Sequence, residues 1–289
     1  MLRWRLLLGL LFIASLVGIC WADIHARTPG LWLLPLALLL AGLAGGEMLR
    51  LMRSGNLRPV AWPIHAGNAL MIAANYAPQA MGAGDPLGPF GWLMLAFAAG
   101  VILAFVGEMR RYSGPGRVTE QLSAAVLVQA YIGLMLSFMI QLRLLGGMAA
   151  LLSLVIVVKM CDTGAYAVGR LLGRHKMTPL LSPGKTFEGL AGGLAFACLG
   201  SWLAFEQLVP RMLPGGAPRA VPAWDWLAYG LLVGIAGVLG DLAESLLKRD
   251  VGQKNSSDWM PGFGGVLDIL DSVLLAAPVA YFCWALELV

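Results

Sequence analysis

The sequence predicts an all-α, polytopic integral membrane protein with about nine transmembrane helices and a cytoplasmic N-terminus. Of the 289 residues, 59% are hydrophobic and only 12% are charged, and the mean hydropathy is +0.77. A soluble domain is roughly a quarter charged. Apolar runs long enough to cross a bilayer as helices, about 20 residues, recur along the chain. A transmembrane barrel would instead show alternating segments of about ten residues.

The apolar runs define nine expected spans. They are Leu6–Trp21, Leu31–Met48, Val60–Tyr76, Phe90–Val106, Ser123–Ile140, Leu144–Lys159, Leu190–Phe205, Trp226–Leu247 and Val273–Leu286. The third span is the weakest because it carries His65, Asn68 and Asn75, and the last one is short.

The positive charges support this topology. With the N-terminus inside, the outside segments hold only Arg27, Arg143, Arg211 and Arg219 of the 20 Lys and Arg residues. Cytoplasmic loops of membrane proteins carry such an excess of Lys and Arg. Both polar segments discussed below then lie on the cytoplasmic face.

We expect one integrated membrane domain with two regions. Residues 1–143 form an N-terminal multi-span region, and residues 144–289 form a catalytic region with polar loops at 159–189 and 241–271. The chain has no basic tail or aromatic-studded basic patch, which argues against nucleic acid as a partner. Its four Cys are far apart, so neither a zinc site nor a disulfide framework is implied.

The first polar segment reads KMCDTGAYAVGRLLGRHKMTPLLSPGKTFEG from Lys159 to Gly189. The run from Ser182 to Thr186 predicts a turn into a helix, where hydroxyls, backbone N–H groups and Lys185 would suit a phosphate. It is no P-loop, because position 179 is Pro where that motif needs Gly. An ordinary basic loop attracted to anionic lipid explains the segment equally well.

The second polar segment runs from Gly240 to Asp271 and reads GDLAESLLKRDVGQKNSSDWMPGFGGVLDILD. Asp241, Glu244 and Lys248 share one helix face. Two antiparallel helices would bring Asp241 close to Asp268, and Mg²⁺ prefers such carboxylates together with substrate phosphates. Salt bridges at helix ends would explain one acid, but not Asp241 and Glu244 within an apolar helix, so we favour a site.

We expect single polar side chains elsewhere in the chain to have structural roles. His25, His65, Glu47 and Glu108 lie near expected helix ends, and we expect packing roles for them.

Four ordered blocks carry a family resemblance. The stretch from Ser245 to Asp271 resembles the signature of the CDP-diacylglycerol synthases, or phosphatidate cytidylyltransferases, and GDLAES precedes it as in that family. DTGAYAVGRLLGRHK and SPGKTFEG are similar to two further family blocks, in the same order. The resemblance covers about the C-terminal half. Four residues depart from the pattern: Gly184, Asn255, Phe263 and Ile269 replace the family's usual Lys, Asp, His and Arg.

The resemblance implies transfer of a cytidylyl group from CTP to phosphatidate, giving CDP-diacylglycerol and pyrophosphate in phospholipid biosynthesis. It implies a multi-pass enzyme of the inner membrane, with its active site on the cytoplasmic face, phosphatidate entering from the inner leaflet, and often a homodimer. It also implies dependence on Mg²⁺, with a second cation left open.

The expected residues follow from matching the motifs. Metal ligands are Asp241 and Asp268, with Asp271 beside them, and Lys185 and Lys248 complete the catalytic set. The remaining candidates for substrate binding are Arg249, Lys254, Ser182, Thr186, Asp162 and Glu244.

Two alternatives remain. One is a CTP-dependent or kinase-type enzyme acting on another lipid, isoprenoid or archaeal. The other is an ion-coupled transporter with Asp241 and Glu244 as the coupling pair, although the acids cluster in one half of the chain and no inverted repeat is visible.

Overall fold

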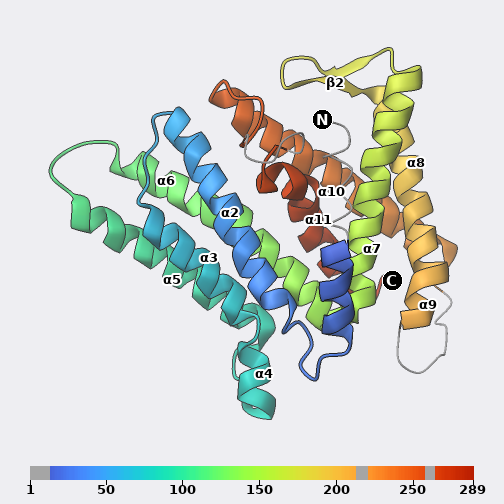
Figure 1. Ribbon diagram of the computed structural model, residues 1–289, viewed down its shortest axis with the longest axis horizontal. Helices are drawn as coiled ribbons and strands as arrows, with labels where there is room; N and C mark the ends of the chain where they lie inside the picture. Colours follow the sequence, from blue (N-terminus) through green and yellow to red (C-terminus); the bar gives the residue numbers. More distant parts are fainter. Residues whose placement is uncertain (1–13, 213–220, 258–263) are drawn as a thin grey trace. The chain divides into compact units, whose positions relative to one another are not determined.

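The computed structural model describes residues 14–212, 221–257 and 264–289, and these are almost entirely helical (Figure 1). A short apolar helix, Ala14–Ile24, comes first. The other elements are α2 (Leu33–Ser54), α3 (Ala61–Ala74), α4 (Ala77–Met81), η1 (Gly82–Gly84), α5 (Gly88–Arg111), α6 (Val118–Val128), η2 (Gln129–Leu134), α7 (Met135–Leu172), β1 (Lys176–Thr178), β2 (Ser182–Thr186), α8 (Phe187–Leu203), η3 (Ala204–Leu208), α9 (Val209–Met212), α10 (Ala223–Asp250) and α11 (Val266–Ala285).

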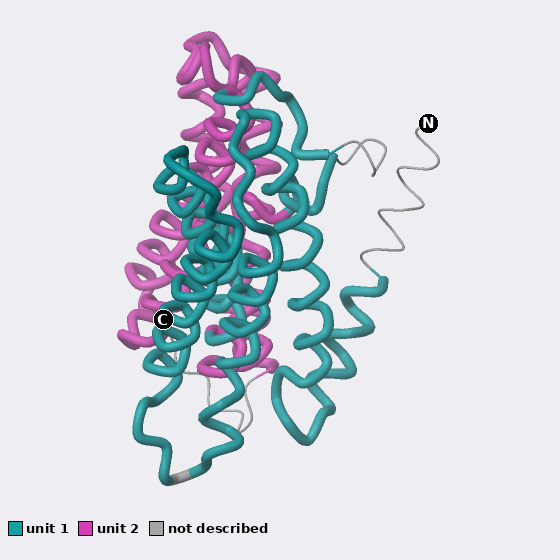
Figure 2. Tube along the Cα trace, turned by 90° about the vertical axis from the view of Figure 1, so that its left-hand side faces the viewer, with its two compact units in different colours: residues 1–141, 250–269 teal, residues 142–249, 270–289 magenta. Residues whose placement is uncertain are grey.

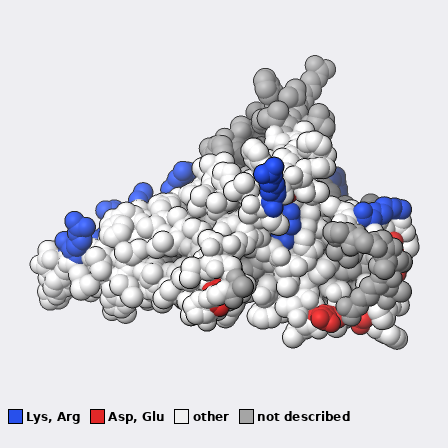
Figure 3. Space-filling view, turned by 90° about the horizontal axis from the view of Figure 1, so that it is seen from below, with Lys and Arg blue, Asp and Glu red and all other residues white. Residues whose placement is uncertain are grey.

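Six helical stretches of the described chain are long and apolar enough to span a membrane. They are Leu33–Ser54, Gly88–Arg111, Val118–Leu172, Phe187–Met212, Ala223–Asp250 and Val266–Ala285. Many large apolar side chains on them remain exposed, such as Leu39, Leu95 and Ile102, as expected for helices that face lipid. Figure 3 shows a face on which charged side chains are sparse.

The first expected span, Leu6–Trp21, lies partly outside the described residues, and the expected spans after it map onto these helices with two differences. The expected spans 123–140 and 144–159 belong to one helical stretch, Val118–Leu172, whose break lies at Gly147 with φ 72° and ψ −168°. This left-handed conformation suits Gly because it has no Cβ. The expected third span is a helix of only 14 residues, Ala61–Ala74. The polytopic helical fold is confirmed, while the count of nine and the side of the N-terminus stay predictions.

The chain forms two compact units, coloured separately in Figure 2. Unit 1 comprises residues 1–141 and 250–269, and unit 2 comprises residues 142–249 and 270–289. Residues 1–141 of unit 1 fall within the expected N-terminal region and residues 250–269 within the second polar segment, while the expected single membrane domain stays a prediction. The boundaries fall within α7 and α11 and at the end of α10, so these helices run from one unit to the other.

Close helix packing in unit 1 centres on α3 and α5. A Cβ added at Gly67 of α3 would lie 3.1 Å from the Cα of Gly100 on α5. The buried side chain of Gln129 in η2 lies at this crossing and donates from Nε2 to the carbonyls of Pro63 and Gly100, each at 3.1 Å. Small residues let two helix backbones approach, and the amide then joins them.

Unit 2 pairs the C-terminal part of α7 with α8 through glycines. A Cβ at Gly164 would lie 2.5 Å from Phe196 and 2.8 Å from the carbonyl oxygen of Gly192. One at Gly173 would lie 2.7 Å from the hydroxyl of Thr186. These glycines therefore let α7 approach α8 and the end of β2 closely.

A two-stranded antiparallel hairpin, β1 and β2, connects α7 to α8. The sequence predicted a plain turn here. The structure instead pairs Lys176 with Thr186 and Thr178 with Ser182, and α8 begins directly after β2. The hairpin holds the SPGKT motif extended, with Pro183 and Gly184 exposed and Lys185 less so.

Candidate active site

In unit 2, the two polar segments meet at one ion pair. Lys185 Nζ on β2 lies 2.8 Å from Asp241 Oδ2 on α10, and the two side chains are 21% and 38% exposed. Thr186 ends the strand and caps α8 by accepting a hydrogen bond from the Gly189 N–H at 3.1 Å. The cap fixes where the helix begins, and Lys185 directly precedes it. The sequence motifs SPGKT and GDLAES therefore form one charged site.

One helical turn further along α10, Glu244 and Lys248 form a buried pair. Glu244 is fully buried, and its Oε2 accepts from Lys248 Nζ at 2.8 Å. Asp271 of α11 lies within hydrogen-bonding reach of Glu244 and close enough to Asp241 for their charges to interact. Three carboxyl groups and two lysines thus share this part of unit 2. Charges in an apolar environment need such partners.

Gly240 explains how Asp271 comes so near to α10. A Cβ at Gly240 would lie 2.4 Å from the carbonyl oxygen of Asp271 and 3.0 Å from the Cα of Ser272. The backbones of α10 and α11 thus approach at the residue before Asp241. The Gly of the GDLAES motif thus has a physical reason, because it admits the backbone of α11 next to Asp241.

Asp268 lies in unit 1 and organises the loop that precedes α11. Its Oδ2 accepts from the Gly265 N–H at 2.8 Å, the Ser256 N–H at 3.1 Å and the Ser256 hydroxyl at 2.6 Å. α11 begins at Val266, so Asp268 is its third residue and bonds back to the amide just before the helix. This is the reciprocal half of a capping box.

Glu47 of α2 holds the same helix start, a role beyond the packing expected from the sequence. Its exposed fraction is 1%, and it accepts from the N–H groups of Val266 at 3.1 Å and Leu267 at 2.8 Å. Its Oε2 also lies 3.4 Å from the Ser256 hydroxyl. The one available signal was an acid within an apolar helix, and nothing in the sequence linked it to a segment 219 residues away.

The last two glycines of the PGFGG motif are explained by these carboxylates. Gly264 has φ 80°, and a Cβ there would lie 2.5 Å from Asp268 Oδ2. A Cβ at Gly265 would lie 2.3 Å from Glu47 Oε2 and 2.3 Å from the Ser256 hydroxyl. Phe263, where the family has His, lies outside the described residues, as does the rest of 258–263.

The other residues predicted to bind substrate differ in exposure and in their hydrogen-bond partners. Asp162 is bonded to Lys159 Nζ at 3.0 Å near the surface, and Ser182 is partly buried in β2. Arg249 donates from Nε to the Leu181 carbonyl at 3.2 Å, which ties the end of α10 to the hairpin. Lys254 is exposed in the loop of unit 1.

The basic side chains of the first polar segment lie in two different environments. Arg170, Arg174, His175 and Lys176 are exposed, while Lys185 turns to Asp241. Glu188 accepts from the backbone N–H groups of Arg174 and His175 and contacts the His175 ring at 2.5 Å. These contacts close the base of the hairpin.

The metal ligands expected from the sequence are partly assembled. Asp241 and Asp271 lie near each other in unit 2, whereas Asp268 belongs to unit 1, so the Asp241–Asp268 contact stays a prediction. Within the described ranges, no three His, Cys, Asp or Glu side chains form a group that could hold a metal ion alone. The carboxylate oxygens are nevertheless of the chemistry that Mg²⁺ prefers, and it takes one or two protein carboxylates when substrate phosphates supply the rest.

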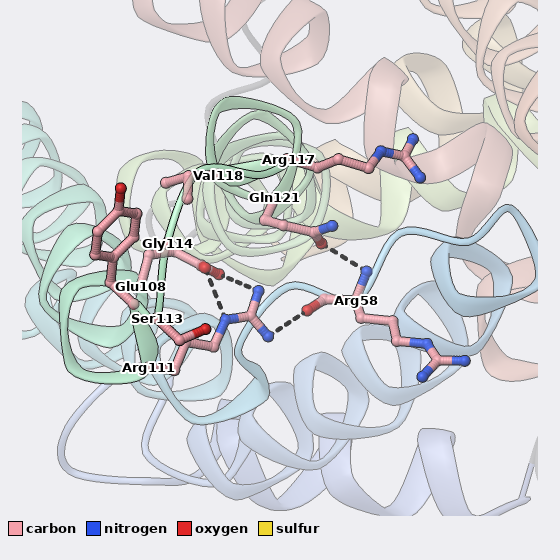
Figure 4. Close-up of a pocket in the computed structure, with 9 residues that line it drawn as sticks. Arg58, Glu108, Arg111, Ser113, Gly114, Arg117, Val118 and Gln121 are labelled. Carbon is pink, nitrogen blue, oxygen red and sulfur yellow. Dashed lines mark hydrogen bonds and ion pairs between the residues drawn. The ribbon is translucent and has the colours of Figure 1, made fainter.

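A separate pocket of about 260 Å³ in unit 1 lies where α5 ends and α6 begins (Figure 4). The Arg111 guanidinium donates to both oxygens of Glu108, at 2.7 and 2.8 Å, and to the Arg58 carbonyl at 2.7 Å. Gln121 accepts from the Arg58 N–H at 2.6 Å. These bonds fasten the segment before α3 to both helices, which gives Glu108 the structural role expected for it.

Comparison with known proteins decides the family. Residues 4–286 match the sequence profile described as the cytidylyltransferase family. The chain belongs to this family. The match covers residues of both units and includes both polar segments. It confirms the resemblance drawn from the four motif blocks.

Individual relatives are similar over shorter stretches. The phosphatidate cytidylyltransferase of Bacillus subtilis (strain 168) is 36% identical over 169 residues, 58% of this chain and 60% of the relative. That of Staphylococcus saprophyticus is 36% identical over 150 residues, 52% of this chain and 54% of the relative. An uncharacterized protein of Escherichia coli (strain K12), YnbB, is 38% identical over 137 residues, 47% of this chain and 43% of the relative. The aligned part is thus less than two thirds of each relative.

Proposed function

We propose that this chain transfers a cytidylyl group from CTP to phosphatidate, giving CDP-diacylglycerol and pyrophosphate. The observation that carries the proposal is the 2.8 Å pair between Lys185 and Asp241, which joins two motifs into one charged site. Membership in the cytidylyltransferase family and two relatives named phosphatidate cytidylyltransferase supply the reaction class.

The chemistry requires little proton transfer. A phosphate oxygen of phosphatidate attacks the α-phosphorus of CTP, the new P–O bond forms, and the bond to the β-phosphate oxygen breaks to release pyrophosphate. The attacking group is already an anion, so neither a strong base nor a covalent nucleophile is needed. The barrier comes from bringing two polyanions together, which positioned positive charge lowers.

Lysine and arginine side chains provide that charge. We assign Lys185 and Lys248 to the reacting phosphates, with Arg249 and Lys254 as further phosphate contacts. Lys185 and Lys248 are paired with Asp241 and Glu244 at 2.8 Å each, so these acids hold the two ammonium groups in place at the charged site. Ser182, Thr186 and Asp162 are the remaining contacts proposed for CTP.

Carboxylates would hold the metal. We assign Asp241 and Asp268 to Mg²⁺, with Asp271 and Glu244 beside Asp241. A bound divalent cation would screen the phosphates and stabilise the departing pyrophosphate. We further propose that the site faces the cytoplasm, that phosphatidate enters from the inner leaflet, and that the enzyme acts as a homodimer.

The acceptor lipid distinguishes phosphatidate from the alternative lipid phosphates. The test supplies purified protein in detergent with labelled CTP, Mg²⁺ and one acceptor at a time: phosphatidate, an isoprenoid phosphate or an archaeal-type ether lipid phosphate. We expect lipid-linked cytidine with phosphatidate at the highest kcat/KM. A higher kcat/KM with another acceptor would replace phosphatidate and retain the cytidylyltransferase chemistry. Family membership favours either enzyme over the ion-coupled transporter.

A further inference from the structure

The start of α11 lacks an ordinary capping residue. The first N–H groups of a helix have no partner within the helix, and a Ser, Thr, Asp or Asn before the first turn normally accepts from them. Gly265 occupies that position here and has no side chain to do so. The first two amides of the helix, those of Val266 and Leu267, donate instead to Glu47 of α2.

Glu47 is well suited to replace a cap. Both of its oxygens are used, Oε1 by Val266 at 3.1 Å and Oε2 by Leu267 at 2.8 Å, so the carboxylate spans the open end of the helix. A negative charge at a helix N-terminus is favourable because the peptide dipoles point their positive ends towards it. The absence of a Cβ at Gly265 lets the carboxylate approach this closely, since an added Cβ would lie 2.3 Å from Oε2.

The turn held by Glu47 is the turn that carries Asp268. Asp268 follows Leu267 directly, and its Oδ2 accepts from the Ser256 hydroxyl at 2.6 Å. The same hydroxyl lies 3.4 Å from Glu47 Oε2. Glu47, Ser256 and Asp268 therefore form one network, in which α2 fixes the helix start and the loop before α11 fixes the Asp268 carboxylate. All three residues belong to unit 1.

We infer that Glu47 is a positioning residue that sets the place of Asp268 by capping α11 from α2. The inference rests on the proposed function, in which Asp268 serves the cytidylyl transfer. A buried acid with a merely structural role would support folding of unit 1 without any particular effect on the reaction.

The decisive variant is Glu47→Gln. Gln has nearly the same shape, but its amide nitrogen cannot accept a hydrogen bond. The variant can therefore accept from the N–H of Val266 or of Leu267, but not from both. The matched control is Glu108→Gln, which also removes a buried carboxylate from unit 1, one that accepts from Arg111 and lies 3.4 Å from the Val60 N–H. Both variants lose a buried charge and backbone contacts, and only the first touches α11.

Three quantities are measured on the full-length variants in detergent: the melting temperature, amide hydrogen exchange of the segment 264–270, and kcat and KM for CTP. We expect both variants to lower the melting temperature. Glu47→Gln is expected to speed exchange in 264–270 and to lower kcat by about ten-fold or more, as loss of such supporting partners does. Its KM for CTP should change little. Glu108→Gln should leave exchange in 264–270 and kcat as in the wild type.

Ser256→Ala provides a second test should Glu47→Gln fail to fold. It removes the hydroxyl between Glu47 and Asp268 and leaves both backbone amide bonds of Glu47 in place, so we expect lower kcat with unchanged exchange at Val266 and Leu267. Wild-type kcat in Glu47→Gln or in Ser256→Ala would overturn the inference, and so would an equal loss of kcat in Glu108→Gln. A wild-type protein without any CTP turnover would overturn the proposed function, while the exchange measurement would still show whether Glu47 caps α11.

Discussion

Asp268 has a structural role in the described loop and a chemical role that we propose. Its Oδ2 holds three donors from Ser256 and Gly265, and the carboxylate is also our proposed metal ligand. The sequence motif indicates the chemical role of Asp268. Its structural role depends on hydrogen bonds to Ser256 and Gly265, which only the folded loop shows. The two roles can be separated by substitutions that keep or remove the acceptor oxygen.

Asp268→Asn keeps a carbonyl oxygen for these donors and removes the charge. We expect it to fold with a melting temperature near the wild type and to lose activity at least as severely as the about 10–100-fold loss typical of supporting partners. Asp268→Ala removes the acceptor as well and should also melt earlier. The measurements are CTP turnover and thermal unfolding in detergent. Near-normal turnover in Asp268→Asn would rule out Asp268 as a metal ligand.

Gly265→Ala tests the crowding around the start of α11. The new Cβ would lie 2.3 Å from both Glu47 Oε2 and the Ser256 hydroxyl, so the network must shift. We expect a loss of about 1–3 kcal/mol in unfolding free energy, as for other overpacked positions. Gly46→Ala on α2 is the matched control, because nothing lies within 4 Å of its added Cβ. Equal stability of the two variants would contradict the described packing.

Among the elements, the hairpin between α7 and α8 does most to place a predicted catalytic residue. Its second strand holds the SPGKT motif in an extended conformation and ends at Thr186. The buried hydroxyl of Thr186, the residue after Lys185, caps α8. Thr186 was expected to bind substrate, and the structure gives its hydroxyl a partner within the helix. The strand pairing was hidden from the sequence, because Pro and Gly in a short polar run are typical of a loop.

Substitutions at Thr186 test how much its cap stabilises the start of α8. Thr186→Val keeps the shape and removes the acceptor for the Gly189 N–H, so we expect a loss of about 1 kcal/mol in unfolding free energy. Thr186→Ser retains the hydroxyl and should keep most of that stability. Thermal unfolding of both variants in detergent checks the difference. A Val variant as stable as the Ser variant would show that the cap contributes nothing.

At the scale of the whole molecule, much of the fold follows from the sequence. Long apolar runs predict helices because a bilayer demands backbone hydrogen bonding within each segment, and the helical architecture is confirmed. The expected spans Ser123–Ile140 and Leu144–Lys159 leave a connection around Arg143, but the helix continues through Arg143 and breaks at Gly147.

The candidate site was predictable where motifs supplied it and unpredictable where distant segments meet. Lys185 and Asp241 were both chosen from the sequence, and the structure pairs them. The role of Glu47 could not be derived, because a single acid in an apolar helix indicates burial without indicating its partner. Contacts between segments 219 residues apart leave no local pattern in one sequence.

The central claim is that this chain joins CTP to phosphatidate. The most direct measurement incubates the purified wild-type protein in detergent with CTP, phosphatidate and Mg²⁺, and quantifies lipid-linked cytidine and pyrophosphate. We predict that both products form in equal amounts, that neither forms without phosphatidate, and that removal of Mg²⁺ by a chelator stops both. Pyrophosphate or CMP released without lipid-linked cytidine, or no turnover at all with any lipid phosphate, would contradict the account.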